Sequence, residues 1–353
     1  MQKEKILLPN GSEVEALTPV IISASRSTDI PAFFANWFIE RLKAGYVVWV
    51  NPFNQSPSYV SFKKTRVIVF WTKNPRPLLP LLKELDKYNI NYYFQYTLND
   101  YDDEGFEPNV PIIADRIETF KKLSKIIGPD RVIWRFDPII ITKELTPLAI
   151  LHKISVLSSK LKGYTNKLVF SFIDIAAYRK VQNNLVKAKL YSKEEVLSAE
   201  ASTQQQEEIA NGLAVLKKYW ADHNWDLKIS TCSEKINFEK YGIKHNRCID
   251  PELMEKLFFN DYQLKEYLSK FKPEPKQTEL FSLASNNEAF NYKKFKDKGQ
   301  RKECGCVESK DIGMYNTCSH NCIYCYANTS KEAVIKNRRN FKLLSESIIP
   351  FKK

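Results

Sequence analysis

Short apolar runs alternate with longer segments of helical spacing from residue 19 to residue 234. The runs are rich in valine, isoleucine and aromatic residues, and each ends abruptly in polar side chains. This alternation predicts parallel β-strands joined by crossover helices. Seven strands are predicted, at residues 20–25, 46–50, 66–71, 92–96, 132–135, 168–171 and 227–231.

The segments between the runs have the spacing of amphipathic helices and end at ordinary stop signals, such as Gly45 and Gly163. Helices are expected at residues 32–44, 76–88, 112–127, 147–161, 178–189 and 194–219. The predicted fold class is therefore α/β, with a TIM-like (β/α) barrel formed by residues 1–269. A polar and basic connector is expected at residues 270–303. A C-terminal segment that packs on the barrel is expected at residues 304–353.

Polar side chains follow the predicted strands, at the end that faces the active site of a (β/α) barrel. The candidates that follow the first strand are Arg26, Ser27, Thr28 and Asp29. Turn chemistry alone accounts for the asparagines and prolines at strand ends, but not for Arg26, Lys73 and Arg135. We therefore expect these residues to face a ligand.

Lys73, Arg135 and Asp137, which lie at the ends of predicted strands, are candidates for catalysis. Lys73 could position an anionic group or transfer protons, and Arg135 could bind a carboxylate or phosphate. A salt bridge from Arg135 to Asp137 that closes the top of the barrel is the alternative. Asp29 is a candidate acid or base, and its simpler role is to cap the helix that starts near Pro31.

Five of the seven cysteines lie within the 22 residues from Cys304 to Cys325. Thiolates at this density are the ligands that soft metals and iron-sulfur clusters select. Cys318, Cys322 and Cys325 are separated by three and two residues. Three thiolates on a short loop can hold three irons of a [4Fe-4S] cluster and leave the fourth iron open.

This spacing, with Tyr324 before the third cysteine, resembles the radical S-adenosylmethionine superfamily, and the local sequence is similar to its spore-photoproduct-lyase-type branch. The resemblance implies that the three cysteines hold a [4Fe-4S] cluster and that Tyr324 lies beside the cofactor S-adenosylmethionine. It also implies reductive formation of a 5′-deoxyadenosyl radical. Nearly the whole chain resembles a bacterial family catalogued as a domain of unknown function with a C-terminal cluster of this kind. That resemblance is carried by residues 22–31, 69–75 and 134–138 and by the terminal cysteines.

The chain departs from the superfamily pattern in two ways. The cysteine loop usually follows the first strand of the barrel, whereas here it follows all the other strands, and no Gly-Gly-Glu-like segment is present. A circularly permuted barrel would reconcile the order, with residues 312–315 as the closing strand and residues 329–339 as the helix after the loop. Residues 20–25 would then be the neighbouring strand, and Arg26 to Asp29 would supply the missing cofactor contacts.

Cys304 and Cys306 leave the type of metal site open. If either supplies a fourth thiolate, the cluster is closed and is structural or transfers electrons. If both pair with two loop cysteines, a zinc site results, although their single-residue gap is tighter than a usual zinc knuckle. His320 could ligate metal, could move protons, or could be a loop residue with no role.

The formal net charge of +13 is concentrated near the cysteines, since residues 291–353 contain 14 Lys and Arg against 6 Asp and Glu. A basic surface attracts nucleic acid or phosphorylated ligands, although a solvated basic tail is an equal explanation. The expected substrate is nucleic acid or a nucleotide, and the expected partner is an electron-donor protein of the flavodoxin or ferredoxin type. Two alternatives remain, a nucleic-acid-binding barrel with a closed structural cluster and a zinc-stabilised interaction module.

The expected location is the cytoplasm. No hydrophobic leader follows Met1, and no apolar run approaches the roughly 20 residues that a membrane span needs. We therefore expect no membrane partner.

Overall fold

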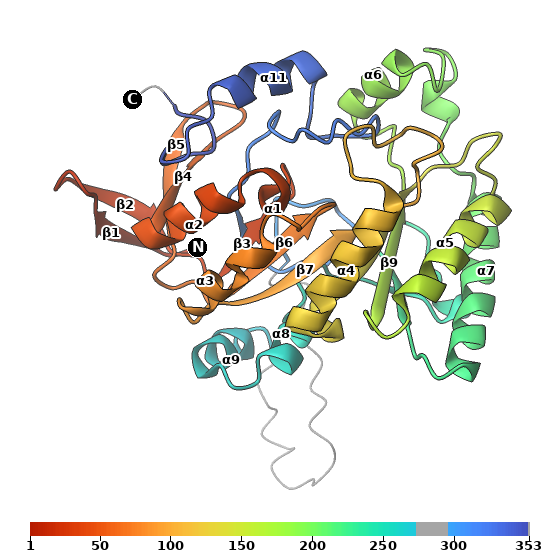
Figure 1. The fold of residues 1–353 in the computed structure, drawn as a ribbon, viewed down its shortest axis with the longest axis horizontal. Helices are drawn as coiled ribbons and strands as arrows, with labels where there is room; N and C mark the ends of the chain where they lie inside the picture. The colour runs from red at the N-terminus through yellow and green to blue at the C-terminus, as the bar shows by residue number, and fades with distance from the viewer. Residues whose placement is uncertain (273–295, 352–353) are drawn as a thin grey trace, which may run out of the picture.

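The computed structural model describes residues 1–272 and 296–351, and its centre is an eight-stranded sheet in which every adjacent pair of strands is parallel (Figure 1). In spatial order the strands are β11 (Lys244–His245), β10 (Lys228–Thr231), β9 (Lys167–Phe172), β8 (Val132–Ile139), β7 (Asn91–Thr97), β6 (Val67–Thr72), β3 (Ile21–Ala24) and β12 (Lys310–Asp311). The predicted mixed α/β fold with a large parallel sheet is confirmed.

One predicted strand belongs to a different sheet. Residues 46–50 form β4 (Tyr46–Val50), which pairs antiparallel with β5 (Pro57–Ser61). A short connection returns the chain directly alongside β4, whereas a parallel pairing would need a long crossover. The hairpin formed by β1 (Lys3–Leu7) and β2 (Glu13–Leu17) completes a four-stranded sheet in the order β1, β2, β5, β4. The prediction of residues 46–50 as part of the parallel sheet was wrong.

Closure of the large sheet into a barrel is not seen among the described residues, where β11 and β12 form its two edges. The short strand β11 was not predicted, and it brings the strand count to eight. The C-terminal strand lies at residues 310–311 rather than at residues 312–315. It pairs in parallel with β3, with Lys310 opposite Ile22 and Asp311 opposite Ser23. The prediction that the C-terminal strand lies beside the first strand is therefore confirmed.

The described helices are α1 (Ile30–Phe33), α2 (Ala35–Ala44), α3 (Leu82–Asp86), α4 (Ile113–Ile127), α5 (Pro147–Leu161), α6 (Arg179–Lys187), α7 (Thr203–Asp222), α8 (Pro251–Leu257), α9 (Tyr262–Ser269) and α11 (Lys331–Arg339). Helices α4 and α5 match their predicted bounds closely, while the helix predicted at residues 76–88 is reduced to α3 and a preceding short turn. The connector predicted at residues 270–303 lies mostly outside the described residues. None of the helices in the described part of the chain has the length and apolarity to cross a bilayer.

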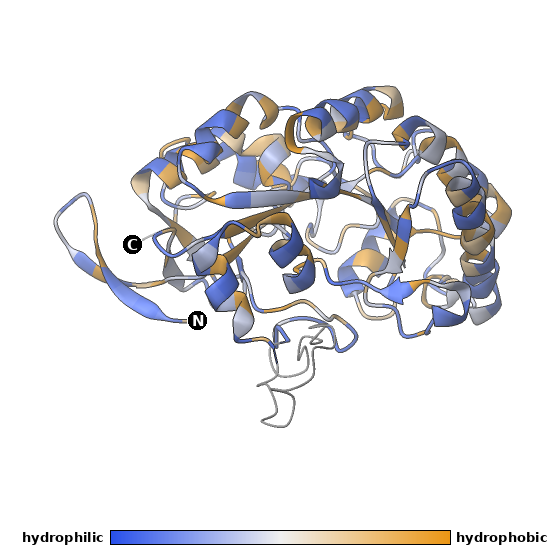
Figure 2. Cartoon of the chain, turned by 90° about the horizontal axis from the view of Figure 1, so that it is seen from below, coloured by the Kyte–Doolittle hydropathy of each residue, from blue (hydrophilic) through white to orange (hydrophobic). Residues whose placement is uncertain are grey.

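Side chains on the parallel strands alternate between two hydrophobic cores. On β6, Ile68 and Phe70 pack into the larger core with helices such as α4 and α5, whereas Val67 and Val69 pack into a second core with α8 and α9. Figure 1 shows α8 and α9 at the opposite end of the sheet from α11. Hydrophobic residues concentrate on the strands and on the inner sides of the helices, while the β1–β2 hairpin is largely hydrophilic (Figure 2).

Candidate functional site

A cavity of about 690 Å³ lies at the carboxyl ends of the parallel strands. Along each strand the face that packs on α8 and α9 changes from apolar to polar as the cavity is approached. On β8, Ile133 belongs to the core, whereas Arg135 and Asp137, two and four residues further on, line the cavity. On β6 the same step leads from Val69 to Trp71 and then to Lys73. A period of two residues therefore directs these side chains to one place.

The structure brings every candidate residue of the sequence analysis to this cavity. Its lining includes Arg26, Ser27, Thr28, Asp29, Lys73, Arg135, Asp137, Cys304, Cys306, Cys318, His320, Cys322, Tyr324 and Cys325. The first and last segments of the fold meet here because β3 and β12 are neighbours in the sheet.

The cysteine triad, Cys318, Cys322 and Cys325, lies on the loop between β12 and α11. All three are free thiols, and burial is the largest influence that raises the pKa of each. The charges of Asp29 and of the other two triad cysteines further raise the pKa of Cys318. Burial therefore favours neutral thiols, and a bound cation would reverse this preference by stabilising the thiolates.

The thiol groups are not arranged around one metal ion. Among residues 1–272 and 296–351, no group of three or more Cys, His, Asp or Glu side chains could hold a single ion as it stands. A cluster that binds each thiolate to a different iron holds its sulfur ligands further apart than one ion does. The donor set of three thiols facing one cavity fits an iron-sulfur cluster by ligand type and number.

A buried ion-pair network anchors the loop that carries the triad. The Tyr324 hydroxyl donates to Glu107, and the same carboxylate accepts hydrogen bonds from Lys73 Nζ at 2.8 Å, Asn99 Nδ2 at 3.1 Å and Arg116 Nη1 at 2.9 Å. Lys73 Nζ also lies 2.9 Å from the Tyr324 oxygen. Tyr324 lies between Cys322 and Cys325 in the sequence. Because the network holds Tyr324, it also sets the position of the loop that carries these two cysteines.

The charges of this network are balanced. Burial opposes ionisation of Glu107, but the positive charges of Lys73 and Arg116 outweigh it and lower the pKa of the carboxyl. Burial also opposes the charge of Lys73, but Glu107 and then Cys322 outweigh it and raise the pKa of the amine. A charged Lys73 favours its role in positioning an anionic group over a role in proton transfer.

Asp29 and His320 hold the start of the fold against the triad loop. Asp29 Oδ1 accepts hydrogen bonds from the Ala32 amide at 2.9 Å and from Thr72 Oγ1 at 2.7 Å. Asp29 therefore caps α1, which is the simpler of the two roles predicted for it. Asp29 Oδ2 contacts His320 Nε2 at 2.9 Å and accepts from the Lys73 amide at 2.7 Å. Asp29 and His320 therefore link the segment after β3 to the triad loop.

Ser27 and Thr28 are also engaged with the C-terminal segment. Ser27 Oγ donates to Asp311 Oδ1 at 3.0 Å, and Thr28 Oγ1 accepts from Thr317 Oγ1 at 2.9 Å. Arg26 differs from them. Its guanidinium lies 5.0 Å from the Trp71 ring centroid, and its buried Nη2 has no hydrogen-bond partner in the described part of the chain. Of the four residues expected to contact the cofactor, Arg26 therefore has an unused donor.

Arg135 and Asp137 form a salt bridge at the top of β8, which the sequence analysis gave as the alternative to a ligand-binding role for Arg135. Arg135 donates to Asp137 Oδ2 from Nε at 3.0 Å and from Nη2 at 2.5 Å. The remaining nitrogen, Nη1, donates to Gln95 Oε1 at 3.3 Å and to Cys248 Sγ at 2.9 Å. The guanidinium thus connects a carboxylate to a cysteine outside the triad.

Several contributing residues were missed by the sequence analysis. Glu107 and Arg116 lie in a loop and on a helix face that no motif singles out. Asp311, which accepts hydrogen bonds from Ser23 Oγ at 2.8 Å and from the Arg26 amide at 2.7 Å, falls just before the predicted closing strand. The only signal available for Asp311 was its place next to that strand.

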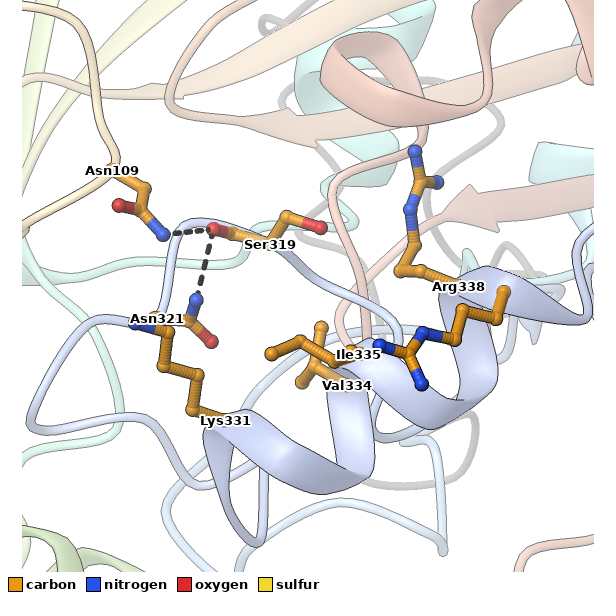
Figure 3. Close-up of a pocket in the computed structure, with 8 residues that line it drawn as sticks. Asn109, Ser319, Asn321, Lys331, Val334, Ile335 and Arg338 are labelled. Carbon is orange, nitrogen blue, oxygen red and sulfur yellow. Dashed lines mark hydrogen bonds between the residues drawn. The ribbon is translucent and has the colours of Figure 1, made fainter.

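A second, shallower groove of about 470 Å³ lies beside the triad loop (Figure 3). Helix α11 forms one side of it with Lys331, Ile335 and Arg339. On the other side, the Asn109 side chain donates to the backbone oxygen of Ser319 at 2.9 Å (Figure 3). The groove therefore reaches the residue that follows Cys318.

These features define an α/β protein with a parallel sheet and a cysteine-lined cavity at the carboxyl ends of its strands. Residues 21–327 match the model of a family described as Domain of unknown function (DUF1848), and the chain belongs to that family. No curated protein and no solved structure is significantly similar to the chain.

Proposed function

We propose that this protein is a radical S-adenosylmethionine enzyme in which Cys318, Cys322 and Cys325 hold an open [4Fe-4S] cluster. The observation that carries the proposal is the order of parallel strand, three-cysteine loop and helix, with the three thiols facing a cavity at the strand ends. When bound, the cluster and S-adenosylmethionine supply a 5′-deoxyadenosyl radical that removes hydrogen from the substrate. The seven free thiols are in keeping with a reducing cytoplasm.

The residues of the cavity suit a small charged cofactor. The volume of about 690 Å³ lies in the range of cavities that enclose a ligand of this size. The unused Nη2 of Arg26 supports a role for this residue in binding a carboxylate or phosphate. Lys73 and Glu107 keep Tyr324 and the adjacent cysteines in position.

The mouth of the cavity supports a nucleotide or nucleic acid as substrate. Trp49, Trp71 and Phe53 line it, and the Phe53 side chain is 95 % exposed. Aromatic faces stack on bases, and cations such as Arg301 bind phosphate.

The groove of Figure 3 supports docking of an acidic electron donor of the flavodoxin or ferredoxin type. Lys331 and Arg339 give this groove positive charge next to Ser319, and Ile335 adds a 41 % exposed apolar contact. Lys331→Glu combined with Arg339→Glu should slow reduction by a protein donor. Reduction by dithionite, which needs no docking surface, should be unchanged.

The test of the proposed function is anaerobic reconstitution of the full chain. The EPR spectrum of the reduced cluster is recorded before and after addition of S-adenosylmethionine, and 5′-deoxyadenosine is measured by chromatography. We expect a shifted spectrum and formation of 5′-deoxyadenosine, both lost in Cys322→Ser. An unchanged spectrum without 5′-deoxyadenosine would reject the radical mechanism and favour a closed cluster, and a colourless protein that contains zinc would favour an interaction module.

A further inference from the structure

The four cysteines outside the triad line the same cavity as the triad. Cys232 follows β10, Cys248 follows β11, and Cys304 and Cys306 precede β12. The sulfur atoms of Cys232 and Cys248 are 3.6 Å apart, and the sulfur atom of Cys306 lies 3.2 Å from the backbone nitrogen of Cys248. We call these four residues the cysteine tetrad. Isolated buried cysteines are common, but packing alone gives no reason for four of them to converge from three segments.

Hydrogen-bond donors surround the sulfur atoms of the tetrad. Cys248 Sγ accepts from Arg135 Nη1 at 2.9 Å and from Asn246 Nδ2 at 3.4 Å. Cys306 Sγ accepts from the backbone amides of Cys248 at 3.2 Å and Ile249 at 3.4 Å. A neutral thiol is a weak acceptor, whereas sulfur bound to a metal carries negative charge that such donors stabilise. The donor arrangement is that of a thiolate site.

Positive charge faces the tetrad from two sides. Arg135 contacts Cys248 directly, and the Arg26 guanidinium lies within electrostatic range of Cys304, Cys306 and Cys248. Arg26 belongs to the segment after β3, which lies beside the edge strand β12, far from β11 in the strand order. Each arginine also lies near a carboxylate, Arg135 at 2.5 Å from Asp137 and Arg26 at 3.8 Å from Asp297, so the two would offset only part of the negative charge of a metal centre with four thiolates.

The spacing of the thiols bears on the type of centre. Tetrahedral zinc with Zn–S bonds of about 2.3 Å places every pair of sulfur atoms about 3.8 Å apart. The 3.6 Å between the sulfur atoms of Cys232 and Cys248 matches one such pair, but no group of three or more side chains among the described residues is placed to hold a single ion. Four thiols match the ligand number of a [4Fe-4S] cluster, whose binding would move the sulfur atoms of Cys232 and Cys248 apart, since each would bind a different iron.

We propose that Cys232, Cys248, Cys304 and Cys306 hold a second [4Fe-4S] cluster, with ligands distinct from those of the triad. Each of its irons would carry a protein thiolate, so this centre has no open iron. It would link the ends of β10 and β11 to the segment that leads into β12, and so join the two edges of the open sheet. The proposal does not depend on radical chemistry at the triad.

The test compares two variants of the full chain after anaerobic reconstitution, with iron, sulfide and zinc measured per chain. One variant replaces the triad by Cys318→Ser, Cys322→Ser and Cys325→Ser. The other replaces two members of the tetrad by Cys232→Ser and Cys248→Ser. We expect about eight irons in the unaltered protein and about four in the triad variant, since each cluster of this type contains four.

The triad variant carries the decisive result. Retention of about four irons and four sulfides in it supports the second cluster, and the tetrad variant should then retain only the iron of the triad. Loss of all iron from a folded triad variant, retention of zinc alone, or four alkylatable thiols at the tetrad positions would overturn the proposal. Circular dichroism checks that each variant is folded. A negative result with S-adenosylmethionine would reject the proposed function and leave this iron count unchanged.

Discussion

Glu107→Gln tests whether the buried network around Tyr324 holds the triad loop. The Glu107 side chain is 1 % exposed, that of Arg116 is 0 % exposed and that of Lys73 is 15 % exposed. Glutamine keeps the shape of the side chain but removes the negative charge. Lys73 and Arg116 would then both contact a neutral amide instead of a carboxylate.

The expected loss of stability follows from that imbalance. Breaking a buried ion pair by removing one partner is destabilising by about 3–5 kcal/mol. Arg116 keeps its second partner, since Nη2 lies 2.8 Å from Asp102 Oδ1, so we expect a loss near the lower end, about 3 kcal/mol. The lowered pKa of Glu107 means that its contribution is present above the unfolded value near 4.5 and is lost as the pH falls through the folded value. The difference between the two proteins should therefore shrink in acid.

Urea unfolding at pH 7 and at acid pH measures the effect. Glu118→Gln is the matched control, because Glu118 is 63 % exposed and pairs with Lys121 at 3.0 Å on the surface of α4. We expect a change of at most about 0.5 kcal/mol in the control. A double-mutant cycle of Glu107→Gln with Tyr324→Phe should give a coupling energy above about 0.5 kcal/mol. A Glu107→Gln protein within about 1 kcal/mol of the unaltered one, with no coupling to Tyr324, would refute the reasoning.

Three further changes probe the junction between β3 and β12. Gly313→Ala should lower the free energy of unfolding by about 1–3 kcal/mol in urea titrations, because a Cβ there would lie 1.8 Å from Ser25 Oγ. Burial lowers the pKa of Lys310 to about 8, while its position 3.4 Å from the Trp49 ring centroid favours the charged form. We weigh burial as the larger effect and expect Lys310→Met to stabilise the protein by about 1 kcal/mol at pH 7, a gain that disappears between about pH 8 and 10.5. Asp311→Asn should lower the free energy of unfolding by about 1–3 kcal/mol. It should also speed amide hydrogen exchange at Gly313, whose N–H donates to Asp311 Oδ1 at 2.9 Å.

The central parallel strands were predictable because they are buried on both faces. Strands of this kind appear as uninterrupted apolar runs, as in β6 and β7. The polar residues that end those runs were therefore identifiable as a set, and Lys73, Arg135 and Asp137 do meet at one cavity. Their position at the carboxyl ends of the predicted strands carried that information.

The sheet to which β4 belongs was not predictable in the same way. Its apolar run looks like that of a parallel strand, and only its pairing with β5 shows the difference. Glu107 lies between strands in a loop without periodicity, and its role depends on Arg116, Lys73 and Tyr324 reaching it in space. Cys232 and Cys248 are isolated in the sequence, and the contact between them appears only in the structure, where it crosses from one strand end to the next.

The candidate site depends on contacts between the two ends of the chain. Ser27, Thr28 and Asp29 bond to partners 284, 289 and 291 residues away, all of them in or after β12. Neither side can form these bonds before the other is in place, and contacts at such sequence separation require the largest loss of chain entropy. The segment after β3 and the triad loop therefore order each other. Any ligand that binds the triad thiols is linked to folding of this junction, because it binds only where the two segments have docked.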